Sequence, residues 1–112
     1  MTNIIFYKNN LGDYIGFECS GHTGFGEYGN DILCASVSAI AQTAVLGVQT
    51  IVGLKKTIVT KNDVDGYLKL EISKNISSGL LEKCSIIVET AYLGLKDLES
   101  GYSSYIKIEE KR

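Results

Sequence analysis

Residues 32–54 read ILCASVSAIAQTAVLGVQTIVGL, contain no charged side chain, and decide the fold. Asn30 or Asp31, immediately before them, predicts the N-cap of a long helix that reaches about residue 54. At about 100° per residue the apolar side chains gather on one broad face, formed by Leu33, Val37, Ile40, Ala41, Ala44, Val48, Ile51 and Val52. Two ordered rows of Ser, Thr and Gln flank this face, and a helix surrounded by lipid has little reason to carry them. We therefore expect a helix buried against a sheet rather than a membrane span.

The same helix carries a second, narrower apolar strip between its polar rows. Its members are Ile32, Ala35, Ala39 and Leu46. Small residues in such a strip allow close approach of another backbone. The strip therefore predicts contact with a second helix or with a second subunit.

Strand patterns lie on both sides of the helix. Runs 4–8 and 14–20 are expected to form a hairpin, as are runs 56–61 and 67–73, which Asp65-Gly66 joins. In the second run, alternation places Ile15, Phe17 and Cys19 on the buried face. A second helix at about 78–100 and a strand at 104–109 complete the order ββαββαβ. This order predicts an α/β two-layer sandwich, with a mixed five-stranded sheet and two helices in one domain, 1–112.

Length and charge limit the classes of function. The chain has 112 residues, a single domain's usual length, and a net charge of −2. Without a basic excess, neither a nucleic-acid partner nor a membrane surface is expected. Three cysteines cannot all pair, and the first residues lack the pattern of a signal peptide. We therefore expect free thiols and a cytoplasmic location.

The segment 21–30 has four glycines in ten residues, which is typical of a loop with unusual backbone angles. Residues 24–29 match the pattern G-x-G-x-x-G of dinucleotide-binding sites. Glu27 would place a carboxylate beside the pyrophosphate, however, and no acid follows at about twenty residues. Nucleotide binding is therefore not expected at this loop.

Cys34 is the candidate nucleophile, because an N-cap at Asp31 places it in the first turn of the helix. The helix dipole contributes about 0.3–1 kcal/mol there, whereas one pKa unit requires about 1.4 kcal/mol. A second cationic group is needed for a mostly ionised thiol. His22 is the single histidine, and a twelve-residue connector spans up to about 40 Å, which easily brings the two together. The pair predicts a cysteine–histidine dyad.

Several other interpretations of these residues stay open. Cys34 is a core residue if it merely packs, as Cys19 and Cys84 are expected to do. Cys19, His22, Cys34 and Asp31 could in principle chelate zinc, but the paired ligand spacing of zinc sites is missing, so no metal or cofactor is expected. A thiol-redox protein is disfavoured because the chain has no C-x-x-C motif.

Residues 21–38, GHTGFGEYGNDILCASVS, resemble the signature of the bacterial ribosomal-processing cysteine protease family. The resemblance extends over the whole chain in length and element order. It implies that His22 is the general base and Cys34 the nucleophile, with Asp31 and Ser38 in supporting roles. Thr23 is bulkier than the residue usual in the family. The resemblance also implies a substrate loop, which comprises Gly21, Gly24, Phe25, Gly26, Tyr28 and Gly29.

As a member of this family, the chain would remove the N-terminal extension of a large-subunit ribosomal protein and would act as a homodimer. Free N–H groups at the start of the helix, that of Cys34 among them, would then stabilise the oxyanion. The alternative is a non-catalytic ribosome-assembly or protein-interaction module in which Cys34 has a structural role.

Overall fold

A computed structural model describes residues 1–27, 30–51, 57–62 and 66–112. The elements follow the expected order ββαββαβ, with a short π-helix, η1, continuing the first helix. They are β1 (Thr2–Lys8), β2 (Tyr14–Ser20), α1 (Ile32–Leu46), η1 (Gly47–Ile51), β3 (Thr57–Asn62), β4 (Tyr67–Ile72), α2 (Ser78–Gly101) and β5 (Ile106–Lys111).

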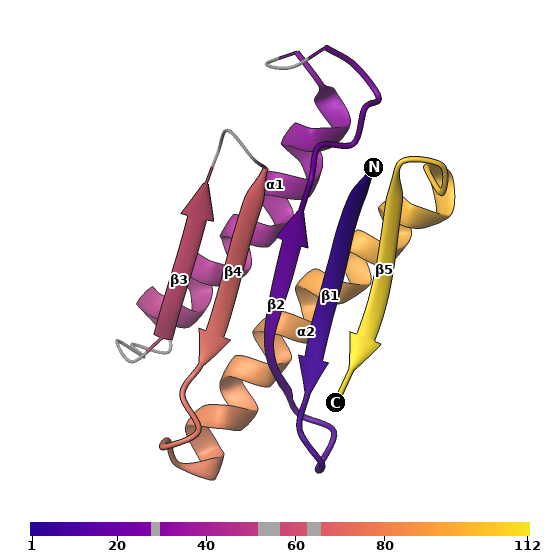
Figure 1. Cartoon of the computed structure of the whole chain (residues 1–112). Helices are drawn as coiled ribbons and strands as arrows, with labels where there is room; N and C mark the ends of the chain where they lie inside the picture. Colours follow the sequence, from indigo (N-terminus) through magenta and orange to yellow (C-terminus); the bar gives the residue numbers. More distant parts are fainter. Residues whose placement is uncertain (28–29, 52–56, 63–65) are drawn as a thin grey trace.

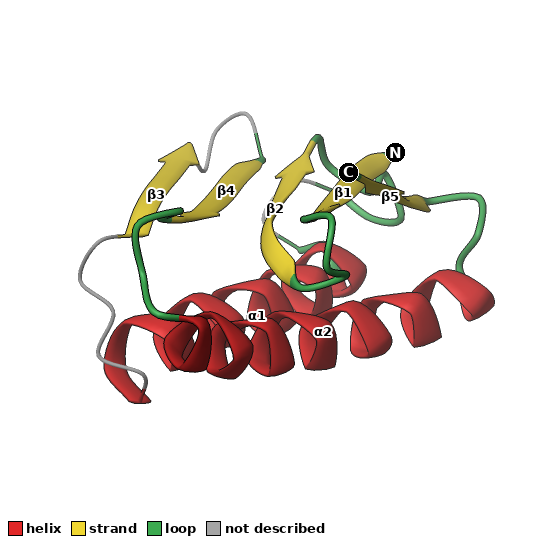
Figure 2. Cartoon of the chain, turned by 90° about the horizontal axis from the view of Figure 1, so that it is seen from below, coloured by secondary structure: helices red, strands yellow, loops and turns green. Residues whose placement is uncertain are grey.

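The five strands form one mixed sheet in the order β3-β4-β2-β1-β5 (Figure 1). β1 pairs with β5 in parallel, and the other neighbours are antiparallel. Both helices cover the same face of the sheet (Figure 2), so the molecule has two layers. The predicted fold class is confirmed. Because β4 and β5 run in the same direction, the chain returns along α2 before β5 begins.

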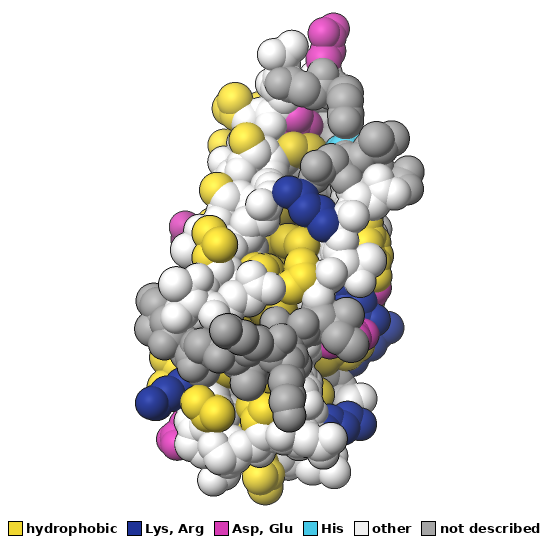
Figure 3. All heavy atoms as spheres, turned by 90° about the vertical axis from the view of Figure 1, so that its left-hand side faces the viewer, with side chains coloured by type: hydrophobic (Ala, Val, Ile, Leu, Met, Phe, Trp, Pro, Cys, Tyr) yellow, Lys and Arg dark blue, Asp and Glu magenta, His cyan; other side chains and the backbone are white. Residues whose placement is uncertain are grey.

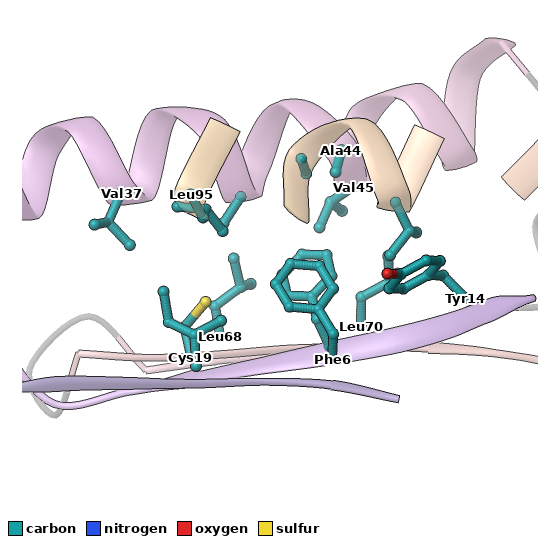
Figure 4. Close-up of a cluster of buried hydrophobic side chains, with 14 of the residues drawn as sticks. Phe6, Tyr14, Cys19, Val37, Ala44, Val45, Leu68, Leu70 and Leu95 are labelled. Atoms are coloured by element: carbon teal, nitrogen blue, oxygen red, sulfur yellow. The ribbon is translucent and has the colours of Figure 1, made fainter. Parts of the chain in front are cut away.

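The core lies between the sheet and the helices, where aromatic and aliphatic side chains interdigitate (Figure 4). The predicted broad face of α1 is the buried one, and Ile40 is packed at its margin. Val52 and the Ile51 side chain lie outside the described residues. The buried residues of α1 and η1 are Leu33, Val37, Ala41, Ala44, Val45 and Val48.

The buried face of β2 differs from the predicted one at its first residues. Tyr7 pairs with Gly16 but Lys8 pairs with Tyr14, so Ile15 is an extra residue in the ladder. Such a β-bulge shifts the alternation by one position. Tyr14 is therefore 4% exposed and packs against the ring of Phe6, while Ile15 is half-buried.

The narrow apolar strip of α1 does not seat the second helix. Ile32 is 68% exposed and Leu46 is 61% exposed. The two helices approach each other at Gly94 and Gly47 instead. A Cβ added at Gly94 would lie 3.6 Å from Ile40, and one added at Gly47 would lie 3.2 Å from Ile87. Glycine at these positions permits the close approach, and the predicted contact with a second subunit stays a prediction.

The stretch Ile32–Thr50 is long and apolar enough, by length and composition, to cross a membrane. The core helix of a soluble protein meets the same criteria. In this structure the buried residues of the stretch face the sheet.

Candidate active site

Asp31 joins the start of α1 to the preceding glycine-rich segment. As the N-cap, it accepts hydrogen bonds through Oδ1 from the backbone N–H groups of Leu33 and Cys34, both at 2.9 Å. Its Oδ2 accepts from the Thr23 hydroxyl at 2.6 Å and from the Gly26 N–H at 3.0 Å. Burial raises the pKa of this carboxyl, but the four hydrogen bonds outweigh burial and hold the pKa well below its ordinary value. Asp31 is therefore ionised, and its carboxylate holds the start of the helix and the loop together.

The Cys34 sulfur is half-buried at the first turn of α1. It accepts a hydrogen bond from the backbone N–H of Thr23 at 3.2 Å, and the Thr23 hydroxyl oxygen lies 3.4 Å from it. The loop therefore contacts the sulfur through two groups of one residue. The Cys34 backbone N–H is already donated to Asp31. The expectation that this N–H is available to an oxyanion is not met in this structure, because the N-cap carboxylate occupies it.

His22 and Cys34 line one cavity of about 450 Å³ between α1, the loop and strands β2–β4. The histidine is half-buried, and it lies against the turn before β4, where a Cβ added at Gly66 would be 3.0 Å from its Cε1. The structure thus brings the two predicted dyad residues to the same site from separate segments. Figure 3 shows this side of the molecule, with hydrophobic side chains in a hollow beneath a basic side chain.

Ser38 also lines this cavity, one helical turn beyond Cys34. Its hydroxyl accepts a hydrogen bond from Gln42 Nε2 at 2.5 Å, and Gln42 Oε1 accepts from Lys61 Nζ at 3.4 Å. These polar groups extend from α1 to β3 along the cavity. The apolar lining includes Val37, Ala41 and Leu68. The cavity is therefore an apolar trough with a polar margin, which suits an extended peptide.

The remaining residues of the predicted substrate loop divide into two groups. Gly21, Gly24 and Gly26 line the cavity. Phe25 is not among the lining residues, and its ring packs edge-on against Tyr102 and Tyr105 at centroid distances of 5.5 and 5.3 Å. This aromatic contact anchors the loop to the end of α2. Tyr28 and Gly29, the last predicted loop residues, lie outside the described part of the chain.

The two other cysteines have environments unlike that of Cys34. Cys19 is 6% exposed, and burial raises the pKa of its thiol to about 12. Cys84 is fully buried, and burial raises its pKa as well. Both thiols are therefore protonated at neutral pH. Within the described ranges, no group of three His, Cys, Asp or Glu side chains is placed to hold a metal ion.

Thr23 is the site residue that sequence reasoning missed. The sequence distinguishes it only as bulkier than the residue usual in the family, yet it is 2% exposed and contacts both Asp31 and Cys34. No spacing rule singles it out, because its contacts depend on the path of a glycine-rich loop. A threonine beside the one histidine was the available signal.

Comparison with known proteins finds relatives in sequence and in fold. The sequence profile of the family described as cysteine protease Prp matches residues 1–107. The ribosomal processing cysteine protease Prp of Bacillus subtilis is 27% identical over 94 residues, which cover 84% of this chain and 83% of that protein. A crystal structure of the ribosomal processing protease Prp from S. aureus, in complex with a covalently linked product peptide, is 25% identical with a TM-score of 0.82. The alignment covers 99% of this chain and 100% of that one. A second S. aureus structure, with a substrate peptide, shares the fold at 24% identity, a TM-score of 0.77 and the same coverage.

Proposed function

Since the chain belongs to the cysteine protease Prp family, we propose that it is a cysteine endopeptidase in which Cys34 is the nucleophile and His22 the general base and acid. The observation that carries this assignment is that both side chains line one cavity, with the sulfur at the start of a helix. A thiolate is favoured at that position by the helix dipole.

In the proposed reaction, His22 carries a proton between the sulfur, the departing amine and water. His22 takes the thiol proton, and the Cys34 sulfur attacks the scissile carbonyl carbon to form a tetrahedral oxyanion. The oxyanion collapses to a thioester while His22 gives its proton to the departing amine. A water molecule, deprotonated by His22, then hydrolyses the thioester. Both thiol and imidazole return to their starting protonation states.

Asp31 has a supporting role in this proposal, because its carboxylate holds the first turn of α1 and the loop in place together. Its two oxygens are both occupied by donors from Thr23, Gly26, Leu33 and Cys34. Ser38 would support the peptide along the margin of the cavity, where its hydroxyl already accepts from Gln42.

The proposed substrate is the N-terminal extension of a large-subunit ribosomal protein. The name of the Bacillus subtilis relative, which refers to ribosomal processing, supports it. The S. aureus relative binds a product peptide covalently. An extended segment of the same kind would lie in the trough beside Cys34, between the loop and the polar margin formed with Gln42.

The test is incubation of the extended ribosomal protein with the wild type, Cys34→Ala and His22→Ala, followed by mass spectrometry of its N-terminus. Only the wild type is expected to release the extension. Cys19→Ala is the matched control, because it removes a thiol from the same cavity that is not proposed to react. Cleavage by the Cys34 or His22 variant would refute the dyad. No cleavage by any protein, with intact binding, would favour the non-catalytic module.

We further propose that residues 1–112 form one protease domain that acts in the cytoplasm as a homodimer. The exposed apolar strip of α1, with Ile32 and Leu46, supports self-association. Light scattering at several concentrations tests it. A dimeric mass that becomes monomeric in Leu46→Arg is expected, and a monomeric wild type would contradict the proposal.

A further inference from the structure

The Thr23 hydroxyl has three neighbours and a fixed supply of hydrogen-bonding groups. A threonine hydroxyl has one proton to donate and two lone pairs to accept with. Its oxygen lies 2.6 Å from Asp31 Oδ2, 3.4 Å from the Phe25 nitrogen and 3.4 Å from Cys34 Sγ. Because the residue is 2% exposed, water does not supply further partners. Each neighbour must therefore be assigned as donor or acceptor.

The hydroxyl proton belongs to the contact with Asp31. An ionised carboxylate can only accept, and Asp31 is held ionised by its four donors. The distance of 2.6 Å is typical of a short, charge-assisted O–H···O⁻ bond. The Phe25 N–H uses one lone pair. The oxygen thus has only its second lone pair to offer the Cys34 sulfur.

We infer that Thr23 is a positioning residue that holds Cys34 as a thiol at rest, by accepting the S–H proton at its hydroxyl oxygen. The backbone N–H of the same residue donates to the sulfur from 3.2 Å and stays in place in either protonation state. When the sulfur ionises, the S–H···O bond is lost and an oxygen lone pair faces a negative charge. The side chain therefore opposes ionisation, while the backbone favours it.

Other charged and titratable groups line the cavity, and all of them stay in the chain when Thr23 is replaced. They are Asp31 at the N-cap, His22 in the loop, Cys19 on β2, Lys61 on β3 and Tyr67 on β4. Replacement of the hydroxyl alone leaves all of them in the chain. A change in sulfur protonation between variants at Thr23 therefore reports on the hydroxyl.

The consequence for catalysis rests on the proposed function. With the thiol proton held by Thr23, ionisation requires that His22 take the proton from an existing hydrogen bond. The nucleophile is then formed during the reaction with the substrate rather than stored beforehand. The protonation of the free protein, in contrast, does not depend on any peptidase activity.

The test compares Thr23→Val, which keeps the branched shape without the hydroxyl, with Thr23→Ser, which keeps the hydroxyl. The readout is the rate at which iodoacetamide alkylates Cys34 across pH, with the site assigned by peptide mass spectrometry. At about pH 6 the valine variant is expected to react about three- to tenfold faster than wild type, as loss of one hydrogen bond to the thiol implies. The serine variant is expected to keep the wild-type pH profile.

Equal or slower alkylation of Thr23→Val, or a serine variant that behaves like valine, would overturn the inference. A thermal melt of each variant checks folding, and Thr23→Ala replaces the valine variant if valine does not fold. Peptide cleavage is measured separately with the same proteins. If Thr23→Val is alkylated faster as expected but the wild type cleaves no peptide, the inference about Thr23 stands and the proposed dyad is refuted.

Discussion

Removal of the Asp31 carboxylate tests how strongly one side chain couples the loop to α1. Asp31→Ala leaves four donors without their acceptor, two of them in the first turn of the helix. Loss of an N-cap costs about 1 kcal/mol. The buried Thr23 hydroxyl loses its acceptor as well, which adds about 1–3 kcal/mol. The exposed Gly26 N–H can turn to water. The expected loss of unfolding free energy is about 2–4 kcal/mol.

The matched control is Ser77→Ala, at the N-cap of α2. Ser77 accepts one hydrogen bond, from the Leu80 N–H at 3.2 Å, and is exposed. Its removal is expected to cost about 0.5–1 kcal/mol. Urea unfolding followed by circular dichroism gives both values. At a slope of about 1.5 kcal/mol per molar, the Asp31 variant should lose roughly 1.3–2.7 M in its midpoint. Equal losses for the two caps would refute the reasoning, because Asp31 would then act on the helix alone.

Three further predictions concern protons, backbone and thiols. The ordinary pKa of an aspartate is 3.8, and folding lowers the pKa of Asp31. The stability that its charge contributes is therefore present above pH 3.8 and falls as the pH drops below that value. The urea midpoint of wild type should decline with acid more than that of Asp31→Asn. Gly66→Ala should lower both the melting temperature and peptide cleavage, because φ is +63° and the new Cβ would lie 2.8 Å from a backbone oxygen. The control Gly79→Ala should change neither, because a Cβ there meets open space. In folded protein at neutral pH, iodoacetamide should label Cys34 and leave Cys19 unlabelled, because burial raises the pKa of Cys19 to about 12. After denaturation all cysteines should be labelled. Labelling of Cys19 in the folded state would contradict its burial.

The order of elements could be predicted from the sequence because each element has a local signal. The uncharged stretch 32–54 repeats its apolar residues with a helical period, and a helix of that kind has to bury one face. The sequence alone offers two residues for the N-cap, Asn30 and Asp31. The structure selects Asp31, since its carboxylate reaches two N–H groups of the first turn.

The bulge in β2 could not be predicted, because strict alternation places Ile15 inward and both Ile15 and Tyr14 are acceptable in a core. The ladder register decides between them, and it depends on how β1 pairs across the hairpin. Tyr14 also gains a partner on the edge strand β5, because its hydroxyl donates a hydrogen bond to Glu110 at 2.9 Å. Contacts of this kind between distant segments cannot be predicted from the sequence of one strand.

The sequence predicts His22, Cys34 and the supporting Asp31 as site residues, and it does not predict the contacts of Thr23 or Gly66. His22 and Cys34 are recognisable because each is a reactive type in a distinctive local setting. Thr23 and Gly66 act through contacts with residues from other segments. Phe25 belongs to the predicted substrate loop, and its contact with Tyr102 at the end of α2 has no signal in the sequence. Tertiary contacts of this kind require the folded loop.

The most direct measurement is the intact mass of the enzyme after a brief reaction with a peptide that spans the cleavage site, followed by an acid quench. The account predicts a transient adduct equal to the N-terminal fragment less one water, and peptide mapping should place it on Cys34. Cleavage that proceeds while Cys34 stays unmodified, or an adduct on another side chain, would contradict the central claim.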